Sequence, residues 1–284
     1  MKETQLRQWL DLKISTPYTL VPDLHGISND SYILTVEEKK YMVRTPKRSH
    51  DLLDVSFRQE NEILDLVHDL DVPLVYFDTE RGIKITRYIP HTHTYKETEK
   101  RAKAFDTGTI LRSLHDKEPV GFYFDPFKKL DHYKKNARKP FISFDQEEQI
   151  VETVKKIYDP DTLCHNDLVD GNLLFSKDRL YLIDYEYASM NDARFDLASF
   201  LSENCIEEEE EREQFFKGYG ITDDQTKKEV ILFELFEDIL WGYWANMLYE
   251  SAHEELYKAI ARDKEAHYRR IMKKINVSSC KACC

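Results

Sequence analysis

The sequence has no long apolar segment and no cysteine pattern that would suit an oxidising compartment. No stretch approaches the roughly 18–20 apolar residues that a membrane-spanning helix needs. The N-terminal stretch MKETQLRQWLDLK lacks the apolar core of a signal peptide. The five cysteines are odd in number and show no disulfide framework. These absences predict a cytoplasmic protein without a membrane-spanning helix.

Positive charge is also scarce. The chain has 41 Lys and Arg residues against 53 Asp and Glu residues, which gives a formal net charge of −12 at pH 7. Proteins bind nucleic acids and anionic membranes through clustered cations. The charge therefore argues against both kinds of partner and is compatible with a small cationic substrate. Near the C-terminus, Cys280, Cys283 and Cys284 have no nearby histidine to complete a metal site, so we expect a disordered tail.

Two unlike halves follow one another along the chain. Between the third and fourth strands of the first half, one helix is expected over about 54–70, and from about residue 96 the pattern is mainly helical. The sequence predicts an α+β, two-lobed protein-kinase-like fold, with a small antiparallel-sheet N-lobe at 1–88 and a mainly helical C-lobe at 89–284. Five segments rich in Tyr, Val, Ile and Leu are predicted as strands, at 18–22, 31–36, 40–44, 74–77 and 83–88.

Polar residues at fixed offsets interrupt the helical half. The string LCHNDLVDGNLLF has the spacing His-x-Asp-x-x-x-x-Asn, which places Asp167 and Asn172 on one short loop. Phosphoryl transfer needs such a loop, because a carboxylate must meet the attacking hydroxyl while an amide oxygen helps to hold magnesium. Asp184 follows a short apolar strand in LYLIDYEYASM and would supply the second metal ligand. An ordinary turn rich in Asp, Asn and Gly is the alternative interpretation of the first string.

A nucleotide site also needs a phosphate-binding turn, a cation on a strand and an acid on a helix. The stretch LHGISNDSYIL has a single glycine, Gly26, and is not a Gly-x-Gly-x-x-Gly loop. Arg44 ends the strand KYMVR, where most kinases carry lysine, and its planar guanidinium can pair bidentately with phosphate. A surface arginine is the alternative for Arg44. Glu60 is favoured as its helix partner, and Glu62 remains the other choice.

Together these strings resemble the choline/ethanolamine kinase family, in particular the bacterial choline kinases of the lic type. The resemblance is carried by CHNDLVDGNLLF and LYLIDYEYASMNDARFDLASF. In addition, GISNDSYIL resembles the family's phosphate loop, RYIP its lobe hinge and EDILWGYWA its choline-pocket helix. The likeness covers the chain from about 24 to 250 and implies the fold shared by aminoglycoside phosphotransferases and protein kinases.

The resemblance also implies roles for individual residues. Asp167 would be the catalytic base, and Asn172 and Asp184 would hold Mg²⁺, with ATP as co-substrate. Asp196 would support the catalytic loop. One departure is His25, which stands where the family often has a second glycine and leaves open how closely the loop can close over the phosphates. The implied nucleotide-binding residues are Ser28, Asn29, Arg44 and Glu60, with the backbone of Arg87 and Ile89 at the hinge.

The substrate end has a physical argument of its own. A quaternary ammonium donates no hydrogen bonds, so proteins bind it with aromatic faces. EDILWGYWA places Trp241 and Trp244 on one side of a helix, with Asp238 one turn earlier. Tyr187 and Tyr257 are expected to add further aromatic walls. The alternative is that two tryptophans at helical spacing fill a core, and that Tyr257 only packs within an amphipathic helix.

The combined prediction is transfer of the γ-phosphoryl group of ATP to choline, giving phosphocholine. Alternatives are a kinase of the same fold that acts on ethanolamine, an aminoglycoside or another small hydroxyl compound, and a nucleotide-binding pseudokinase scaffold. The presence of Asp167, Asn172 and Asp184 argues against the scaffold. Glu186 and Glu203 are two further acids that would bring negative charge to the pocket, although a structural or solvated role is the simpler expectation for each.

Overall fold

The computed structural model describes residues 2–23, 29–47 and 55–281 of the chain. Its contacts divide the protein into two compact units, the first made of residues 1–99 and 171–188 and the second of residues 100–170 and 189–284. The chain thus enters the second unit, returns to the first for 171–188, and leaves it again. This grouping by contacts differs from a single boundary between residues 88 and 89. The predicted division into an N-lobe and a C-lobe at that point stays a prediction.

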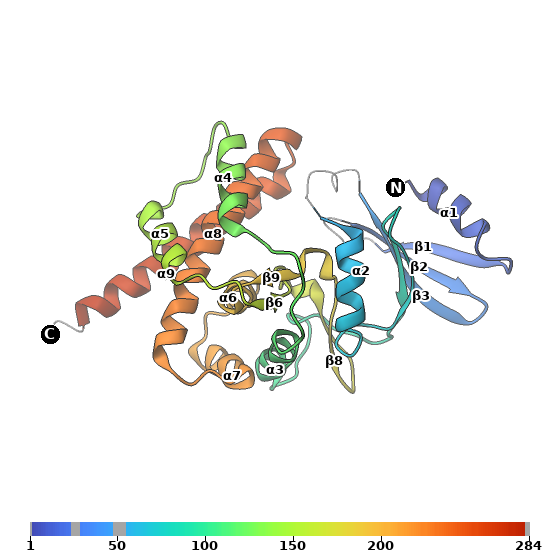
Figure 1. Ribbon diagram of the computed structural model, residues 1–284, viewed down its shortest axis with the longest axis horizontal. Coiled ribbons are helices and arrows are strands. Elements are labelled where there is room, and N and C mark those ends of the chain that lie inside the picture. Colours follow the sequence, from blue (N-terminus) through green and yellow to red (C-terminus); the bar gives the residue numbers. More distant parts are fainter. Residues whose placement is uncertain (1, 24–28, 48–54, 282–284) are drawn as a thin grey trace. The chain divides into compact units, whose positions relative to one another are not determined.

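The first unit is built on one antiparallel sheet with the strand order β1-β2-β3-β5-β4. Figure 1 labels β1, β2 and β3 of this sheet. All five predicted strands are present, so the prediction of a small antiparallel sheet is confirmed. Helix α2, Phe57–Leu66, begins at Ser56, whose hydroxyl accepts a hydrogen bond from the Gln59 N–H. The strands are β1 Tyr18–Asp23, β2 Asn29–Val36, β3 Lys39–Pro46, β4 Leu74–Asp78 and β5 Ile83–Arg87.

Helix α2 ends earlier than the sequence predicts. Beyond Leu66 the chain turns, and the N–H groups of Leu70 and Asp71 both donate to the Val67 carbonyl. The Leu70 carbonyl accepts the N–H of Leu182 instead of continuing a helix. Tertiary hydrogen bonding therefore overrides the helical spacing of the apolar residues at this end. The start of the predicted helix, residue 54, lies outside the described residues.

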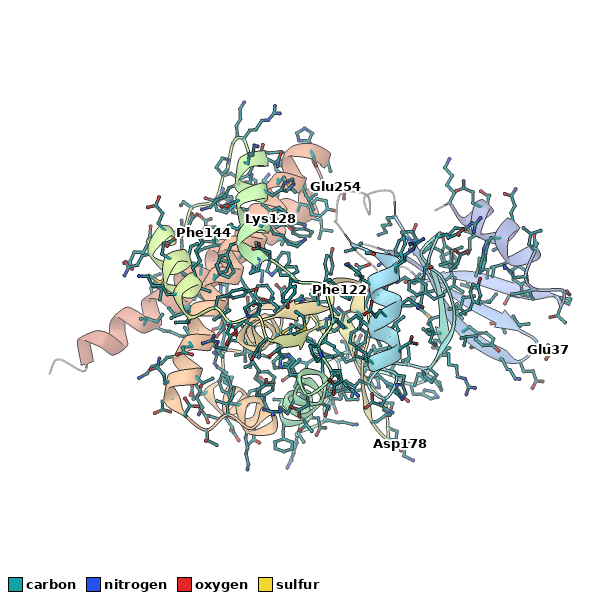
Figure 2. The ribbon with its side chains drawn as sticks, in the orientation of Figure 1. Glu37, Phe122, Lys128, Phe144, Asp178 and Glu254 are labelled. Atoms are coloured by element: carbon teal, nitrogen blue, oxygen red, sulfur yellow. The ribbon has the colours of Figure 1, made fainter. Side chains whose placement is uncertain are left out.

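Helix α1, Glu3–Asp11, was not predicted from the sequence. Its apolar residues Leu6, Trp9 and Leu10 join the core of the sheet, beside residues such as Leu34 and Val43. Residues 171–188 complete this unit with a short hairpin whose strands are β7 Leu173–Phe175 and β8 Leu180–Leu182, followed by the 3₁₀ turn η3 Tyr185–Tyr187. Figure 2 labels Glu37 and Asp178 at the tips of the β2–β3 and β7–β8 hairpins.

The second unit is mainly helical, as predicted. Its longest helices, α8 Asp224–Ala252 and α9 Glu255–Lys281, pack along each other, and α6 Ala193–Glu203 packs against α8. None of the described helices combines the length and apolar character of a bilayer-spanning helix. The remaining elements are α3 Lys103–His115, α4 Pro126–Asn136, α5 Glu147–Ile157, α7 Glu209–Tyr219 and the two-stranded pair of β6 Thr162–Cys164 and β9 Ser189–Asn191.

At one of the three C-terminal cysteines, Cys280, the structure contradicts the expectation of a disordered tail. Helix α9 continues through Lys281, so the backbone at Cys280 is helical and not part of a disordered tail. The sequence after Ile275 contains neither Gly nor Pro, the residues that usually end a helix, so the helix can continue through Cys280. Cys283 and Cys284 lie outside the described residues.

Candidate active site

The loop that carries Asp167 is fixed by a buried carboxylate of α6 in the second unit. Asp196 accepts the backbone N–H of His165 at 2.6 Å and that of Asn166 at 2.7 Å. The His115 ring lies on the same carboxylate, with 3.0 Å between Nε2 and Oδ2. Hydrogen bonds to an ionised acceptor are among the strongest in proteins. Asp196 therefore supports the loop, which is the role expected from the sequence.

Both neighbours of Asp167 are also held in place. Asn166 adopts a left-handed backbone conformation with φ of 66°, and its amide bonds Ser189 and Asn191 of β9. On the other side, the Leu168 N–H donates to the Ser199 hydroxyl at 3.2 Å. Asp167 itself is only half-buried between these buried neighbours. The fold thus holds the backbone on both sides of a carboxylate that solvent can still reach, which suits a general base.

The two predicted metal ligands lie at the same end of the β7–β8 hairpin in the first unit. Asn172 precedes β7, Asp184 follows β8, and the Ile183 N–H donates to the Asn172 carbonyl at 3.0 Å. The Asp184 backbone is left-handed, with φ of 70°, and its side chain is 24% exposed. Carboxylate and amide oxygens are ligands that Mg²⁺ prefers. The donor set therefore fits magnesium, as the spacing of the two motifs suggests.

Arg44 lies at the centre of a buried ion cluster. Its guanidinium pairs with Glu60 of α2, with 2.5 Å between Nη2 and Oε2, and with Asp184. Glu186 lies 3.9 Å away. Glu60 is buried and Glu62 is exposed, so the choice between them falls on Glu60. The pairing of a strand cation with a helix acid is the arrangement that kinases use to position phosphate groups.

A second cation in this cluster was missed by the sequence analysis. Lys84 of β5 lies opposite Arg44 of β3 in the sheet register, and its Nζ is 2.7 Å from Oε1 of Glu60. Four of the five residues of β5 are buried, Lys84 among them. A lysine inside such a strand is costly to bury without a partner. The position of this lysine between Ile83 and Ile85 was the available signal.

The cluster has more acids than bases. Burial alone would raise the pKa of the Glu60 carboxyl, but the Arg44 and Lys84 cations beside it bring that pKa down to about 2. Burial raises the pKa of Asp71, which also faces this cluster, to about 6. The two cations thus face four carboxyl groups, which favours binding of a further cation: Glu60, Asp71, Asp184 and Glu186.

The remaining nucleotide candidates are only partly placed by the structure. The Asn29 amide donates to Oε2 of Glu186 at 3.0 Å, so Asn29 belongs to the same cluster. Arg87 ends β5, with its N–H donating to the Pro73 carbonyl, and Ile89 follows two residues later, half-buried. Their contacts with adenine stay predictions. The other predicted positions in the phosphate turn lie outside the described residues: His25, Gly26 and Ser28.

Three aromatic rings from two helices meet in the second unit. Trp241 and Trp244 of α8 have ring centroids 6.1 Å apart at 87°, and Tyr257 of α9 lies 5.8 Å from Trp244 at 89°. The buried Phe124 ring packs beside them, with its centroid 6.4 Å from that of Trp241. Both tryptophans and Tyr257 are half-buried and not sealed in a core. We call Trp241, Trp244 and Tyr257 the aromatic cluster. A cation is attracted to the face of such a ring, so the accessible parts of these rings could bind one.

Comparison with known proteins assigns the chain to a family. The model of a family described as "Phosphotransferase enzyme family" matches residues 19–230. The chain belongs to this family. Protein LicA of Haemophilus influenzae is 28% identical over 201 residues, which cover 65% of this chain and 58% of that protein.

Solved structures agree with the family assignment. The crystal structure of choline kinase LicA from Streptococcus pneumoniae has a TM-score of 0.73 and 26% identity, and the match covers 95% of this chain and 97% of that one. A structure of LicA in complex with AMP gives a TM-score of 0.74, also at 26% identity, with 95% and 96% covered. The predicted α+β kinase-like fold is confirmed, and the protein is a phosphotransferase.

One residue expected to meet the substrate has other partners in this phosphotransferase. Asp238 is fully buried, its Oδ1 accepts the Ser202 hydroxyl at 3.1 Å, and its Oδ2 is 2.7 Å from Nδ1 of His267. Lys264 lies 3.8 Å from Oδ1 and pairs with Glu203. Both oxygens of Asp238 are thus used inside the protein, which supports helix packing and not a direct substrate contact. Helical spacing alone did not distinguish the two faces.

Tyr187 lies in η3 of the first unit. Its membership of a substrate cage with the aromatic cluster stays a prediction.

A different group of potential metal ligands in the phosphotransferase is already satisfied. Ligand atoms of His115, Cys164 and Asp196 lie within 4.8 Å of one another. Asp196 accepts two loop N–H groups, and the other ring nitrogen of His115 is 2.7 Å from the Tyr219 hydroxyl. Burial raises the pKa of the Cys164 thiol well above its usual range, so the thiolate needed by a metal is disfavoured. These three residues therefore support the loop.

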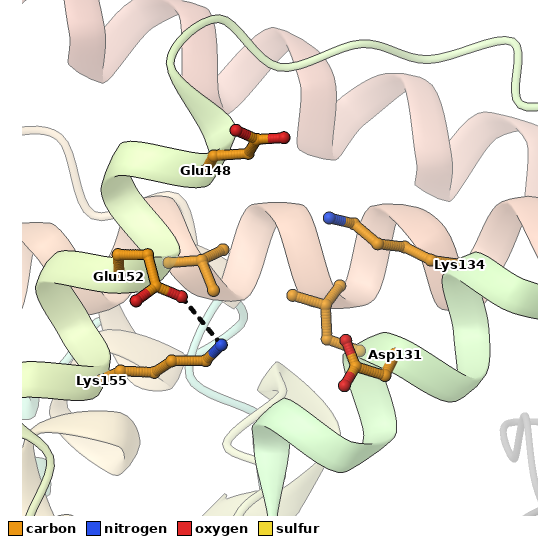
Figure 3. A pocket seen from close by; sticks show the side chains of 7 residues that line it. Asp131, Lys134, Glu148, Glu152 and Lys155 are labelled. Atoms are coloured by element: carbon orange, nitrogen blue, oxygen red, sulfur yellow. Dashed lines mark hydrogen bonds and ion pairs between the residues drawn. The ribbon is translucent and has the colours of Figure 1, made fainter.

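Figure 3 shows a cavity of about 240 Å³ between α4 and α5. Its wall mixes two lysines with three acids, and Lys155 already pairs with Glu152 at 3.0 Å. None of the predicted site residues lies in this wall, so we assign it no part in phosphoryl transfer. The lining residues are Leu130, Asp131, Lys134, Glu148, Val151, Glu152 and Lys155.

Proposed function

We propose that this phosphotransferase transfers the γ-phosphoryl group of ATP to the hydroxyl of choline and releases phosphocholine and ADP. The aromatic cluster is the observation that carries the choice of choline. A trimethylammonium group has no N–H donor, and a cation over an aromatic face gains from about 0.5 to 2 kcal/mol, depending on desolvation. Half-buried, mutually perpendicular rings offer such faces while remaining within reach of a ligand.

The similar proteins support the same substrates. One solved structure with 26% identity over nearly the whole chain is a choline kinase, and the same kind of protein was solved with AMP. Because ATP is the proposed phosphoryl donor, we place the reaction in the cytoplasm. The nucleotide would contact Ser28, Asn29, Arg44 and the backbone of Arg87 and Ile89.

Each step of the transfer has a residue proposed for it. Asp167 accepts the proton of the choline hydroxyl while the choline oxygen forms a bond to the γ-phosphorus of ATP. The bond between that phosphorus and the β–γ bridging oxygen breaks, and ADP leaves. Arg44 binds phosphate oxygens, with Glu60 holding its position. Asn172 and Asp184 would hold Mg²⁺, which neutralises phosphate charge when bound. The catalytic contribution is mostly alignment and charge neutralisation.

Ethanolamine is the alternative acceptor that is most similar to choline in structure. Its ammonium group would require hydrogen-bond acceptors where choline requires aromatic surface. Asp238 was the acid expected beside the tryptophans, and its two oxygens are bonded to Ser202 and His267. This loss of an acceptor favours choline over ethanolamine.

A panel of acceptors tests the proposal. Purified protein, ATP and Mg²⁺ are incubated with choline, ethanolamine or an aminoglycoside, and kcat/KM is measured from ADP release. We expect choline to be the preferred acceptor by at least about tenfold over ethanolamine, which corresponds to about 1.4 kcal/mol. A higher kcat/KM for ethanolamine or for the aminoglycoside would replace choline in the proposal. ADP release that does not depend on any acceptor would remove the kinase assignment.

A further inference from the structure

Glu60 is shared between two cations that come from neighbouring strands. Arg44 bonds its Oε2 at 2.5 Å, and Lys84 bonds its Oε1 at 2.7 Å. The side chains of Glu60 and Lys84 are 1% and 7% exposed. Arg44 and Lys84 are directly opposite each other in the β3–β5 register. The sheet therefore presents two positive groups to one carboxylate of α2.

The two cations differ in the number of carboxylates that lie close to them. Arg44 also pairs with Asp184 and lies 3.9 Å from Glu186, so three carboxylates compete for one guanidinium. Lys84 has Glu60 as its short ion-pair partner among the described residues. A guanidinium that binds phosphate has to direct N–H groups away from at least one of these acids. If Arg44 turned from Glu60 with no other cation present, a buried carboxylate would lose its compensation, which is strongly unfavourable.

We propose that Lys84 is a positioning residue for phosphoryl transfer. It keeps Glu60 ionised and in place, so that Arg44 can direct its N–H groups to the phosphates of the nucleotide. Lys84 acts through Glu60 and does not itself contact the nucleotide. This inference rests on the nucleotide site proposed above.

The geometry favours this indirect role over a direct phosphate contact. Lys84 is among the four buried residues of β5, and its ammonium group lies within hydrogen-bond distance of Oε1 of Glu60. Asp71, a second buried acid, also interacts with Lys84. If this ammonium group moved toward a phosphate, Glu60 and Asp71 would both lose part of the positive charge that compensates their burial.

Steady-state kinetics on four variants tests the role. Lys84→Met removes the charge, and Lys84→Arg keeps it. Glu60→Gln removes the carboxylate, and the double variant Lys84→Met/Glu60→Gln measures the coupling between the two residues. Lys39→Met is the matched control, since Lys39 is exposed at the start of β3 in the same sheet. KM for ATP, KM for choline, kcat and melting temperature are measured for each protein.

We expect Lys84→Met to raise KM for ATP or to lower kcat. Because a misplaced binding group can cost about a hundredfold in rate, kcat/KM for ATP should fall on the order of tenfold to a hundredfold. KM for choline should stay within about twofold, a split that general loss of structure would not give. Lys84→Arg should restore most of the loss. In the Glu60→Gln background, Lys84→Met should cause little further loss.

Two outcomes overturn the inference. One is unchanged ATP kinetics in Lys84→Met, even with a lowered melting temperature. The other is a full additional loss in the Glu60→Gln background, which would mean that Lys84 contacts the nucleotide. Lys84→Gln is measured in parallel in case the methionine variant does not fold, and a charge-dependent role predicts the same loss for it. Failure of the proposed function is a separate result, because the wild-type protein itself would then not consume ATP in the presence of choline.

Discussion

Each of the two units contains a buried charged network, and the networks differ in whether solvent can reach one of their carboxylates. In the first unit, Arg44, Lys84 and Glu60 form a cluster whose fourth member, Asp184, is 24% exposed. In the second unit, Asp238 has both oxygens bonded by residues of α6 and α9 and is fully buried. A buried network pays a large desolvation cost. Where one carboxylate remains accessible, that cost can be offset by a ligand, whereas a closed network can only hold helices together.

The surfaces offered to a ligand differ in the same way. The first unit gathers four carboxyl groups around two cations, a composition suited to a metal ion and phosphates. The second unit offers the half-buried aromatic cluster beside its closed network. In the proposed function, charge would serve the phosphate end of the reaction, and aromatic surface would serve the cationic end. Each of the following predictions tests one side of this contrast.

The largest effect is expected for Asp167→Asn. General base catalysis contributes about 10²–10⁴-fold, so kcat should fall by about 10³-fold. Nucleotide affinity should stay within about twofold, because the carboxylate is proposed to meet the acceptor hydroxyl and not ATP. Turnover and nucleotide binding are measured on the same preparation, with Asp178→Asn at the exposed tip of the β7–β8 hairpin as control. Near-wild-type turnover would remove Asp167 as the base.

A somewhat smaller loss is expected when the accessible carboxylate of the first cluster is removed. Asp184→Ala should lower kcat on the order of a hundredfold or more at every choline concentration, since a carboxylate proposed to hold Mg²⁺ is lost. Excess chelator should silence the wild-type protein, and added Mg²⁺ should restore it. Full activity of the wild-type protein in chelator would contradict the proposed metal site.

Trp244→Leu separates a ligand-binding role from a core role in the second unit. It approximately keeps apolar volume but removes an aromatic face worth up to about 2 kcal/mol for a desolvated cation. KM for choline should rise about tenfold, with KM for ATP unchanged and the melting temperature modestly lower. Trp9→Leu is the matched control, because Trp9 is buried in the core of the first unit. It should lose stability and keep its choline constant.

If Trp244→Leu instead behaved like Trp9→Leu, the aromatic cluster would be a core element. Saturation with choline and thermal unfolding are therefore measured on both variants. The comparison is sharp because Trp241, Trp244 and Trp9 are the three tryptophans of the chain.

The smallest effect concerns a buried acid of α8, Glu237, which precedes Asp238 in the sequence. Burial raises the pKa of Glu237 well above the ordinary 4.5, and neither of its oxygens has a hydrogen-bond partner among the described residues. The folded state thus retains a proton that the unfolded state releases above about pH 4.5. The free energy of unfolding should fall as pH rises above that value, by about 1.4 kcal/mol for each unit between the folded and unfolded pKa.

Glu237→Gln should remove this dependence and make the protein more stable than wild type at pH 8. Urea unfolding at pH 5 and pH 8 measures it, with Glu254→Gln at the exposed α8–α9 turn as control. An equal pH dependence in Glu237→Gln and wild type would show that Glu237 is ionised in the folded state.

Local patterns were enough to predict the sheet. Segments rich in Tyr, Val, Ile and Leu marked all five strands. The spacing of Asp167, Asn172 and Asp184 predicted phosphoryl transfer, and their individual roles stay predictions. Those features depend on residues close in sequence. Glu60 could not be separated from Glu62 in this way, because the choice depends on which helix face meets the sheet.

Features that depend on distant residues were missed. Helix α1 is stabilised by packing against strands that follow it, and Lys84 is stabilised by Glu60, which lies on another element. Asp238 was assigned to the substrate because helical spacing places it near Trp241, whereas His267 and Ser202 determine its surroundings. Buried charged side chains are thus the hardest part of this site to predict, since their partners come from elsewhere in the chain.

The most direct test of the account is the identity of the product. Wild-type protein, ATP, Mg²⁺ and choline are followed by phosphorus NMR, beside Asp167→Asn under the same conditions. We predict one phosphocholine formed for each ADP in the wild-type reaction, and almost none with Asp167→Asn. Inorganic phosphate in place of phosphocholine, or equal phosphocholine formation by Asp167→Asn, would contradict the account.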